Sequence, residues 1–247
     1  MVTSRRNVIG GGLSVLALAD VGEAQDRATA EQVAKSLMSG PRAEALDTPA
    51  LRGNILAFTF KQPPTDLVVP KVKLERRSGL HGFQPEPGLT LVSLWAPWCA
   101  PCLLELKDLA EQQRLYANKR FRILPILTGT RDPITLAEAQ GTLEKAGVRG
   151  LEAVVDRSPA SDSLFEQLTR RETPGGSIKG LPCNLLIDAR GKVLARQFGA
   201  PLDLPRGTKP TPEMRANARS MWMAADGHAL LKALRDGEIA GSVARAS

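Results

Sequence analysis

The chain has 247 residues, a formal net charge of +7 and an apolar fraction of 43%. This length is enough to bury a hydrophobic core without a disulfide scaffold, and three cysteines are too few to build one. Aromatic residues make up only 4% of the sequence and are not interleaved with a long Lys/Arg cluster, so the composition argues against nucleic-acid binding. The basic charge favours acidic partners or anionic membrane surfaces only weakly.

Residues 1–24 have the pattern of an export signal. Arg5 and Arg6 resemble a twin-arginine motif, and the apolar stretch that follows them is diluted by glycines and too short to span a bilayer. Cleavage is expected just before Asp20 or after Ala24. A basic N-terminus without a targeting role is the alternative. If the signal is used, the mature protein works in the periplasm.

Residues 25–64 are predicted to be an irregular N-terminal extension. Five prolines fall between residues 41 and 70, so this stretch is expected to be a tethered arm with little regular structure. Residues 55–60 are the exception, because their apolar run could pair as an edge strand. Residues 65–247 are predicted to form one folded domain, which opens with a strand over residues 68–74.

The element that carries chemistry is a predicted strand followed by a predicted helix, with two cysteines at their junction. The apolar run between Gly88 and Pro97 predicts a buried strand, and the apolar spacing beyond it predicts an amphipathic helix that ends near Asn118. Cys99 falls at the helix N-terminus, where unpaired backbone N–H groups and the helix dipole stabilise a thiolate. Cys102 lies one turn further on. The spacing predicts a reversible dithiol.

The same two cysteines could instead supply half of a zinc site. Zinc would need two further ligands, and outside the pair the sequence offers only Cys183, His81 and His228. A strand before the pair, a helix after it and Trp98 beside the first cysteine favour redox chemistry.

The remaining chain alternates between predicted strands and helices. Residues 121–128 predict a second core strand, in which Pro125 implies a bulge or a sheet edge because proline removes a ladder hydrogen bond. Asp132 and Pro133 are predicted to cap and start a helix that ends near Lys145. Further strands are predicted over residues 151–155, 183–188 and 192–198, and further helices over residues 161–170 and 221–234.

The segment from Leu94 to Cys102, together with Glu105, resembles the TlpA/ResA group of bacterial extracytoplasmic thiol-disulfide oxidoreductases in the thioredoxin superfamily. Pro182, followed by a strand and a turn, resembles the cis-proline loop of that superfamily, whereas a trans proline opening an edge strand is the alternative. The resemblance implies an α/β fold with a thioredoxin-like central mixed β-sheet flanked by helices.

The residues around the dithiol suggest a division of roles. Cys99 is predicted to attack a substrate disulfide, and Cys102 to resolve the mixed disulfide. Glu105 stands on the same helical face three residues after Cys102, and the resemblance implies that it modulates the pair by handling the proton of Cys102. Its alternative is an acid that the helix dipole favours. Ser93 stands where thioredoxin carries a buried acid, which leaves Glu105 as the nearby candidate for this proton transfer.

The resemblance implies a reductant of protein disulfides, in apocytochrome c or in copper-delivery proteins of respiratory oxidase assembly. A membrane thiol reductant would supply the electrons, and no cofactor is expected. The rival is a non-enzymatic copper or metal chaperone that binds through the two thiols and a soft neighbour. Candidate soft ligands are Met214, Met221, Met223 and His228, which are more simply explained as core and loop residues. Cys183 is expected to be a packed thiol.

Overall fold

The computed structural model describes residues 41–63, 67–85, 87–128, 132–170, 180–203, 211, 213–214 and 219–239. The predicted export signal, residues 1–24, lies outside this described part, as do residues 171–179 and most of the loop between residues 204 and 218.

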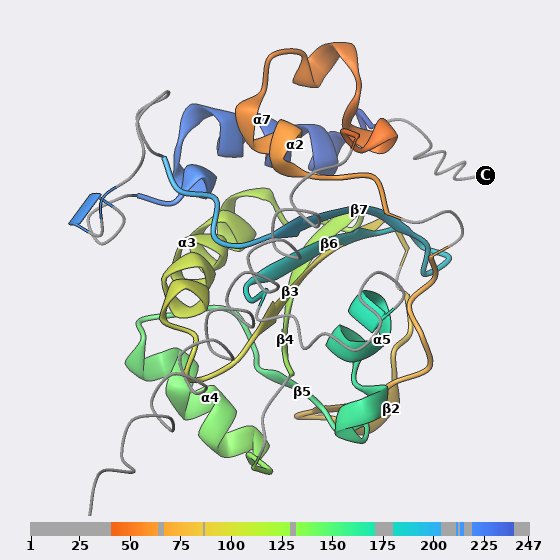
Figure 1. The fold of residues 1–247 in the computed structure, drawn as a ribbon, viewed down its shortest axis with the longest axis vertical. Coiled ribbons are helices and arrows are strands. Elements are labelled where there is room, and N and C mark those ends of the chain that lie inside the picture. Colours follow the sequence, from red (N-terminus) through yellow and green to blue (C-terminus); the bar gives the residue numbers. More distant parts are fainter. Residues whose placement is uncertain are drawn as a thin grey trace, which may run out of the picture.

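Within the described part, seven strands form one mixed sheet in the order β2-β1-β5-β4-β3-β6-β7 (Figure 1). They are β1 (Lys73–Arg76), β2 (Gly79–Gly82), β3 (Leu89–Trp95), β4 (Phe121–Leu127), β5 (Val154–Asp156), β6 (Cys183–Ile187) and β7 (Val193–Phe198). Strand β4 is parallel to both β3 and β5, whereas β6 is antiparallel to β3 and β7 is antiparallel to β6. The predicted central mixed sheet is confirmed.

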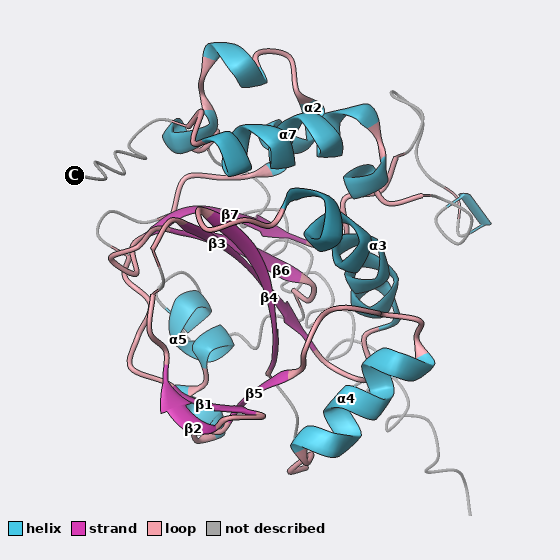
Figure 2. Ribbon diagram, turned by 180° about the vertical axis from the view of Figure 1, so that it is seen from behind, coloured by secondary structure: helices cyan, strands magenta, loops and turns pink. Residues whose placement is uncertain are grey.

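Helices cover both faces of this sheet (Figure 2). Helix α3 (Ala100–Tyr116) connects β3 to β4, and α4 (Leu136–Lys145) connects β4 to β5, as parallel neighbours require. Helix α5 (Leu164–Arg170) lies on the opposite face. Because β3 is covered on both sides, all seven of its residues are buried. Leu91 and Trp95 pack in the apolar cluster on the α3 side, and Val92 and Leu94 in the cluster on the α5 side.

Residues 55–59 are helical, so the edge strand predicted over residues 55–60 is wrong. They form α2 (Ile55–Thr59), which packs against α7 (Ala225–Asp236) (Figure 1). Asn54 caps α2 by accepting a hydrogen bond from Ala57 N at 2.7 Å, and its own Nδ2 donates to Asp226 O at 2.8 Å. The cap and the contact with α7 outweigh the strand propensity of this run. Leu56 and Ala57 join the core, whereas Ile55 and Phe58 are exposed.

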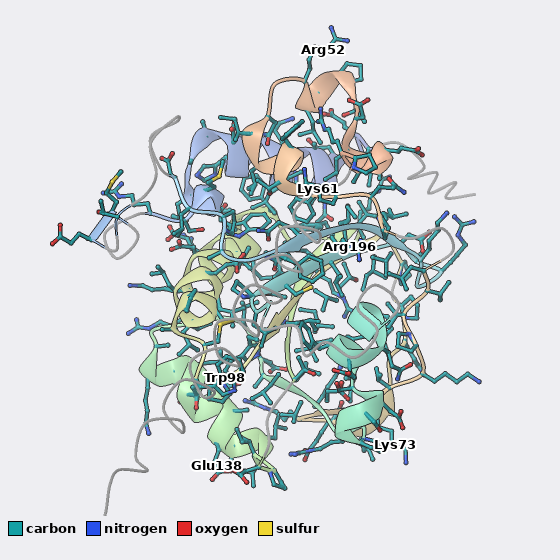
Figure 3. All side chains as sticks on the ribbon, viewed as in Figure 1. Arg52, Lys61, Lys73, Trp98, Glu138 and Arg196 are labelled. Carbon is teal, nitrogen blue, oxygen red and sulfur yellow. A yellow bond between two sulfur atoms is a disulfide. The ribbon has the colours of Figure 1, made fainter. Side chains whose placement is uncertain are left out.

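The expected tethered arm between residues 41 and 70 is also more ordered than its prolines indicate. Two short 3₁₀ helices, η1 (Glu44–Leu46) and η2 (Pro49–Leu51), precede α2 and bury Leu46 and Leu51. Further on, the backbone of Lys61 pairs with that of Arg196 and closes the outer edge of β7 (Figure 3). The predicted start of the folded domain, near residue 65, stays a prediction.

Two predicted boundaries are displaced by local capping and pairing. The strand expected over residues 68–74 begins only at Lys73. Helix α4 is capped by Thr135 rather than Asp132, because Thr135 and Glu138 form a reciprocal capping box with Thr135 N to Glu138 Oε2 at 2.8 Å and Glu138 N to Thr135 Oγ1 at 3.2 Å.

Pro125 lies in a central strand, and the bulge or edge predicted there is wrong. It pairs in register with Ser93 of β3, and the β3–β4 ladder has no register shift at this point. The ladder with β5 begins only at the next residue, Ile126. The missing N–H of Pro125 therefore breaks no hydrogen bond of the β5 ladder.

The closing helix predicted over residues 221–234 is divided in two. A 3₁₀ turn, η4 (Met221–Met223), precedes α7, and the chain folds back at Ala224. Gly227 permits this close approach, because a Cβ there would lie 2.3 Å from Trp222 O. The break places Trp222 inside the core instead of on a helix face. None of the helices in the described part has the length and apolarity to cross a membrane.

Candidate active site

Cys99 and Cys102 form a disulfide at the junction between the end of β3 and the start of α3. The two Cα atoms are 5.2 Å apart, and the S–S distance is 2.03 Å. Cys99 is the N-cap of α3, and its carbonyl oxygen accepts from Cys102 N at 3.0 Å and from Leu103 N at 3.2 Å. Pro101 lies in the first turn, where no N–H is needed. The predicted placement of both cysteines is confirmed.

The two cysteines differ little in exposure in this oxidised form. Cys99 is 4% exposed and Cys102 is 0% exposed, so Cys99 is only marginally more exposed than Cys102. Trp98 beside them is 64% exposed and lies just before the N-terminal end of α3 (Figure 3).

Pro182 follows a cis peptide bond, so the predicted cis-proline is confirmed and the trans alternative is wrong. The next residue, Cys183, pairs with Leu94 near the end of β3. By the antiparallel register, Pro182 therefore lies level with the end of β3, from which the chain leads directly into Cys99. The sheet thus brings two segments far apart in sequence to one side of the site.

Glu105 is buried on the inner face of α3, with 1% of its surface exposed. Its Oε1 accepts from Trp222 Nε1 at 2.5 Å and from Asn184 Nδ2 at 2.6 Å, while Oε2 has no hydrogen-bond partner among the described residues. Desolvation raises the pKa of Glu105 from 4.5 to about 7, against the lowering effect of both hydrogen bonds, and Asp108 adds a further rise. Glu105 is therefore a buried core residue rather than a surface acid.

Three residues of this site, Asn184, Gln197 and Trp222, were not found from the sequence. Asn184 pairs with Ser93 across β3 and β6, and with Gln197 across β6 and β7. Ser93, Asn184 and Gln197 therefore form one buried polar row across the sheet, and Asn184 contacts Glu105. The available signal for Asn184 and Gln197 was a polar residue at an inward-facing position of a mainly apolar strand. Strand periodicity places such residues on a face, but it does not say which helix covers them.

Asp108 stands one turn beyond Glu105 on the same helix. It is half-buried, and desolvation raises its pKa, although a hydrogen bond from Ser220 lowers it. Its charge in turn raises the pKa of Glu105.

Two of the four soft side chains proposed for copper, Met223 and His228, have other partners. Met223 Sδ accepts from Gln112 Nε2 at 3.0 Å, and His228 Nδ1 lies 2.9 Å from Tyr116 Oη. In the ranges that the structure describes, no group of three or more His, Cys, Asp or Glu side chains could hold a metal ion. Cys183 is buried in the cluster on the face opposite α3.

The fold and the site together define a class of protein. A mixed sheet with a parallel β3-α3-β4 unit and an antiparallel β6-β7 hairpin is thioredoxin-like. A Cys-Xaa-Xaa-Cys disulfide at the start of the first crossover helix, beside a cis-proline, is the site of a thiol-disulfide oxidoreductase.

No protein-family model matches the sequence. Similar solved structures include a thiol:disulfide interchange protein from Bacteroides sp., with 20% identity and a TM-score of 0.43 over 54% of this chain and 81% of that one. A thioredoxin-family thiol:disulfide interchange protein from Chlorobium tepidum has 21% identity and a TM-score of 0.40 over 54% and 86%. StoA from Bacillus subtilis has 13% identity and a TM-score of 0.39 over 53% and 90%. At these values the assignment rests on the topology and the site.

Proposed function

We propose that this protein exchanges its Cys99–Cys102 pair with disulfides of protein substrates, and that it acts as a reductant. The observation that carries the proposal is the disulfide at the N-terminus of α3, level with Pro182 and in front of a buried carboxyl. A helix N-terminus favours a thiolate, and a thiolate is the attacking species in disulfide exchange.

The exchange proceeds in two displacements. The Cys99 thiolate attacks one sulfur of the substrate disulfide, whose S–S bond breaks and releases one substrate thiol. The Cys102 thiolate then attacks the Cys99 sulfur, which releases the second substrate thiol and leaves the disulfide seen in the structure. Two electrons pass to the substrate, and a thiol reductant must then supply two further electrons to restore the Cys99–Cys102 dithiol.

Glu105 is the proposed proton acceptor for Cys102. It lies one helical turn from Cys102, in an environment that holds its pKa at about 7. A group with a pKa near the working pH can both take and return a proton, which is the requirement for general acid–base catalysis. Ser93, at the position on β3 where an acid would otherwise stand, is buried and cannot replace it.

The finer proposal is reduction of cysteines in apocytochrome c or in copper-delivery proteins, in the periplasm, with electrons from a membrane thiol reductant. It is supported by the motif resemblance around Cys99 and by the export pattern of residues 1–24. The discriminating experiment adds two compounds separately to the reduced protein. One is an oxidised peptide with the haem-attachment motif Cys-Xaa-Xaa-Cys-His, and the other is Cu(I). We expect turnover of the peptide disulfide. Tight stoichiometric Cu(I) binding without disulfide turnover would favour the metal chaperone instead.

Alkylation of the reduced protein is expected to modify Cys99 faster than Cys102. Cys99 is the N-cap of α3 and carries the small remaining exposure, whereas Cys102 is fully buried within the first turn. Iodoacetamide labelling from pH 5 to 9, followed by peptide mass spectrometry, measures both rates. Equal rates, or faster labelling of Cys102, would contradict the assignment of the nucleophile.

A further inference from the structure

A chain of hydrogen bonds runs from Glu105 to the loop that carries Pro182. Asn184 Nδ2 donates to Glu105 Oε1 at 2.6 Å and to Gln197 Oε1 at 2.8 Å. Gln197 Nε2 donates in turn to the carbonyl oxygen of Gly199. Gly199 N donates to Pro182 O at 2.8 Å. The carboxyl group and the cis-proline are thus joined through two buried side-chain amides.

The two amides are unusual for their positions in the sheet. Asn184 and Gln197 lie opposite each other on β6 and β7, and the inward pair next to them, Leu186 and Ala195, is apolar. A buried amide costs free energy unless it is hydrogen-bonded, and an apolar pair would avoid this cost. A polar link to Glu105 is what the amide pair supplies and an apolar pair cannot.

A second donor reaches the same carboxyl oxygen from η4. Trp222 Nε1 donates to Glu105 Oε1 at 2.5 Å, and the indole ring is held edge-on against Phe60. Hydrogen bonds from N–H groups favour the ionised carboxyl. Asn184 and Trp222 therefore both lower the pKa of Glu105, whereas desolvation raises it. Each donor therefore influences the ionisation of Glu105 through a direct hydrogen bond to its carboxyl group.

We propose that Asn184 is a positioning residue, which holds Glu105 and, through Gln197, sets the Pro182 loop relative to that carboxyl. This proposal rests on the thiol-disulfide function proposed above. Its consequence is that the proton acceptor for Cys102 and the loop beside the disulfide keep a constant relation during exchange. Such second-layer contacts hold reacting groups in productive geometry.

The direct test is the ionisation of Glu105 in the oxidised full-length protein, where the two disulfide cysteines do not titrate. Carbon-13 NMR of glutamate-labelled protein follows the carboxyl, and the signal that disappears in E105Q assigns it. Asp108 of α3 acts electrostatically on Glu105. The side chains that donate to Glu105 from β6 and η4 are the amide of Asn184 and the indole of Trp222, and Gln197 of β7 is linked to it through Asn184.

Asn184→Leu is expected to raise the titration midpoint of Glu105 by about one pH unit, because it removes a hydrogen bond to the charged form. Gln112→Leu is the matched control. Gln112 is also a buried amide, but its side chain donates to Met223 Sδ, so its loss should leave the midpoint unchanged. If Asn184→Leu does not fold, Asn184→Thr replaces it, because threonine suits a strand and is too short to bridge Glu105 and Gln197.

An unchanged midpoint in the Asn184 variant, or an equal shift in Gln112→Leu, would overturn the positioning role. Gln197→Leu tests the other half of the link, since it leaves Asn184 on Glu105 but frees Gly199. It is expected to raise KM for a disulfide peptide about threefold or more, with little change in kcat. An unchanged KM would overturn the coupling to the Pro182 loop.

Failure of the underlying function is a separate outcome. A wild-type protein without exchange activity would refute the proposed function and the role that rests on it. The NMR midpoints do not depend on activity, so an active wild-type protein with unshifted midpoints overturns only the role of Asn184.

Discussion

Cys99→Ser is expected to abolish disulfide exchange, with a rate loss on the order of 10³-fold or more, because a serine hydroxyl cannot replace the thiolate nucleophile. Cys102→Ser is expected to behave differently. It keeps Cys99 at the N-terminus of α3, so the first displacement proceeds, but it lacks the thiol that resolves the mixed disulfide. The substrate should remain covalently attached to Cys99.

Intact-mass measurement of each reduced variant after mixing with a disulfide peptide distinguishes these results. Cys183→Ser is the matched control, because Cys183 is a third thiol buried in the cluster on the opposite face of the sheet. It should exchange at the wild-type rate. A stable adduct on Cys102 in the Cys99 variant, formed as fast as the adduct on Cys99 in the Cys102 variant, would contradict the assignment of the two roles.

Glu105→Gln is expected to make the protein more stable than the wild type at pH 8, by up to about 3 kcal/mol. Desolvation is the main cause of the raised pKa of Glu105, which moves from 4.5 to about 7. A raised folded-state pKa contributes stability that is fully present below pH 4.5 and is lost as the pH rises through about 7. Glutamine carries no ionisation, so the variant should not show this loss.

Urea unfolding at pH 4, 5, 6, 7 and 8 measures the difference between the variant and the wild type, which cancels the contributions of the other carboxylates. Glu111→Gln is the control, because Glu111 is an exposed residue of the same helix. Its curve should run parallel to that of the wild type. A parallel curve for Glu105→Gln would mean that Glu105 is not held in the environment described here.

The same variant is expected to exchange disulfides about 10- to 100-fold more slowly, which is the lower range for a group that transfers a proton. Its pH–rate profile should lose the inflection that Glu105 contributes. The gain in stability and the loss of rate would then come from one substitution, since burying an ionisable carboxyl costs stability and serves catalysis. An unchanged profile would leave the proton of Cys102 to another route.

Local signals in the sequence were sufficient for the element that carries the chemistry. The apolar run between Gly88 and Pro97, the helix after it and the spacing of Cys99 and Cys102 are contained in about thirty consecutive residues. The cis peptide bond before Pro182 could also be predicted from the sequence, because X–Pro is the bond at which the cis form costs little. Strand and helix periodicity are properties of short segments, so these predictions needed no knowledge of distant contacts.

Contacts between segments far apart in the sequence decided the conformations that local patterns predicted wrongly. Residues 55–59 are helical because Asp226 and the rest of α7 lie beside them, and Pro125 is tolerated in a central strand because the β5 ladder starts one residue later. Neither partner can be read from the local pattern, in which an apolar run suits a strand and a proline suits an edge. Tertiary packing overrides such propensities when it buries the same side chains in another conformation.

The environment of Glu105 shows the division most clearly. Its place one turn after Cys102 follows from the sequence, and so does its helical face. Its burial, its pKa of about 7 and its donors do not, because Asn184 and Trp222 come from positions 79 and 117 residues further along the chain. Desolvation and hydrogen bonding depend on which segments meet in the fold. The sequence determined which residue carries the carboxyl, and only the tertiary structure decided how readily that carboxyl ionises.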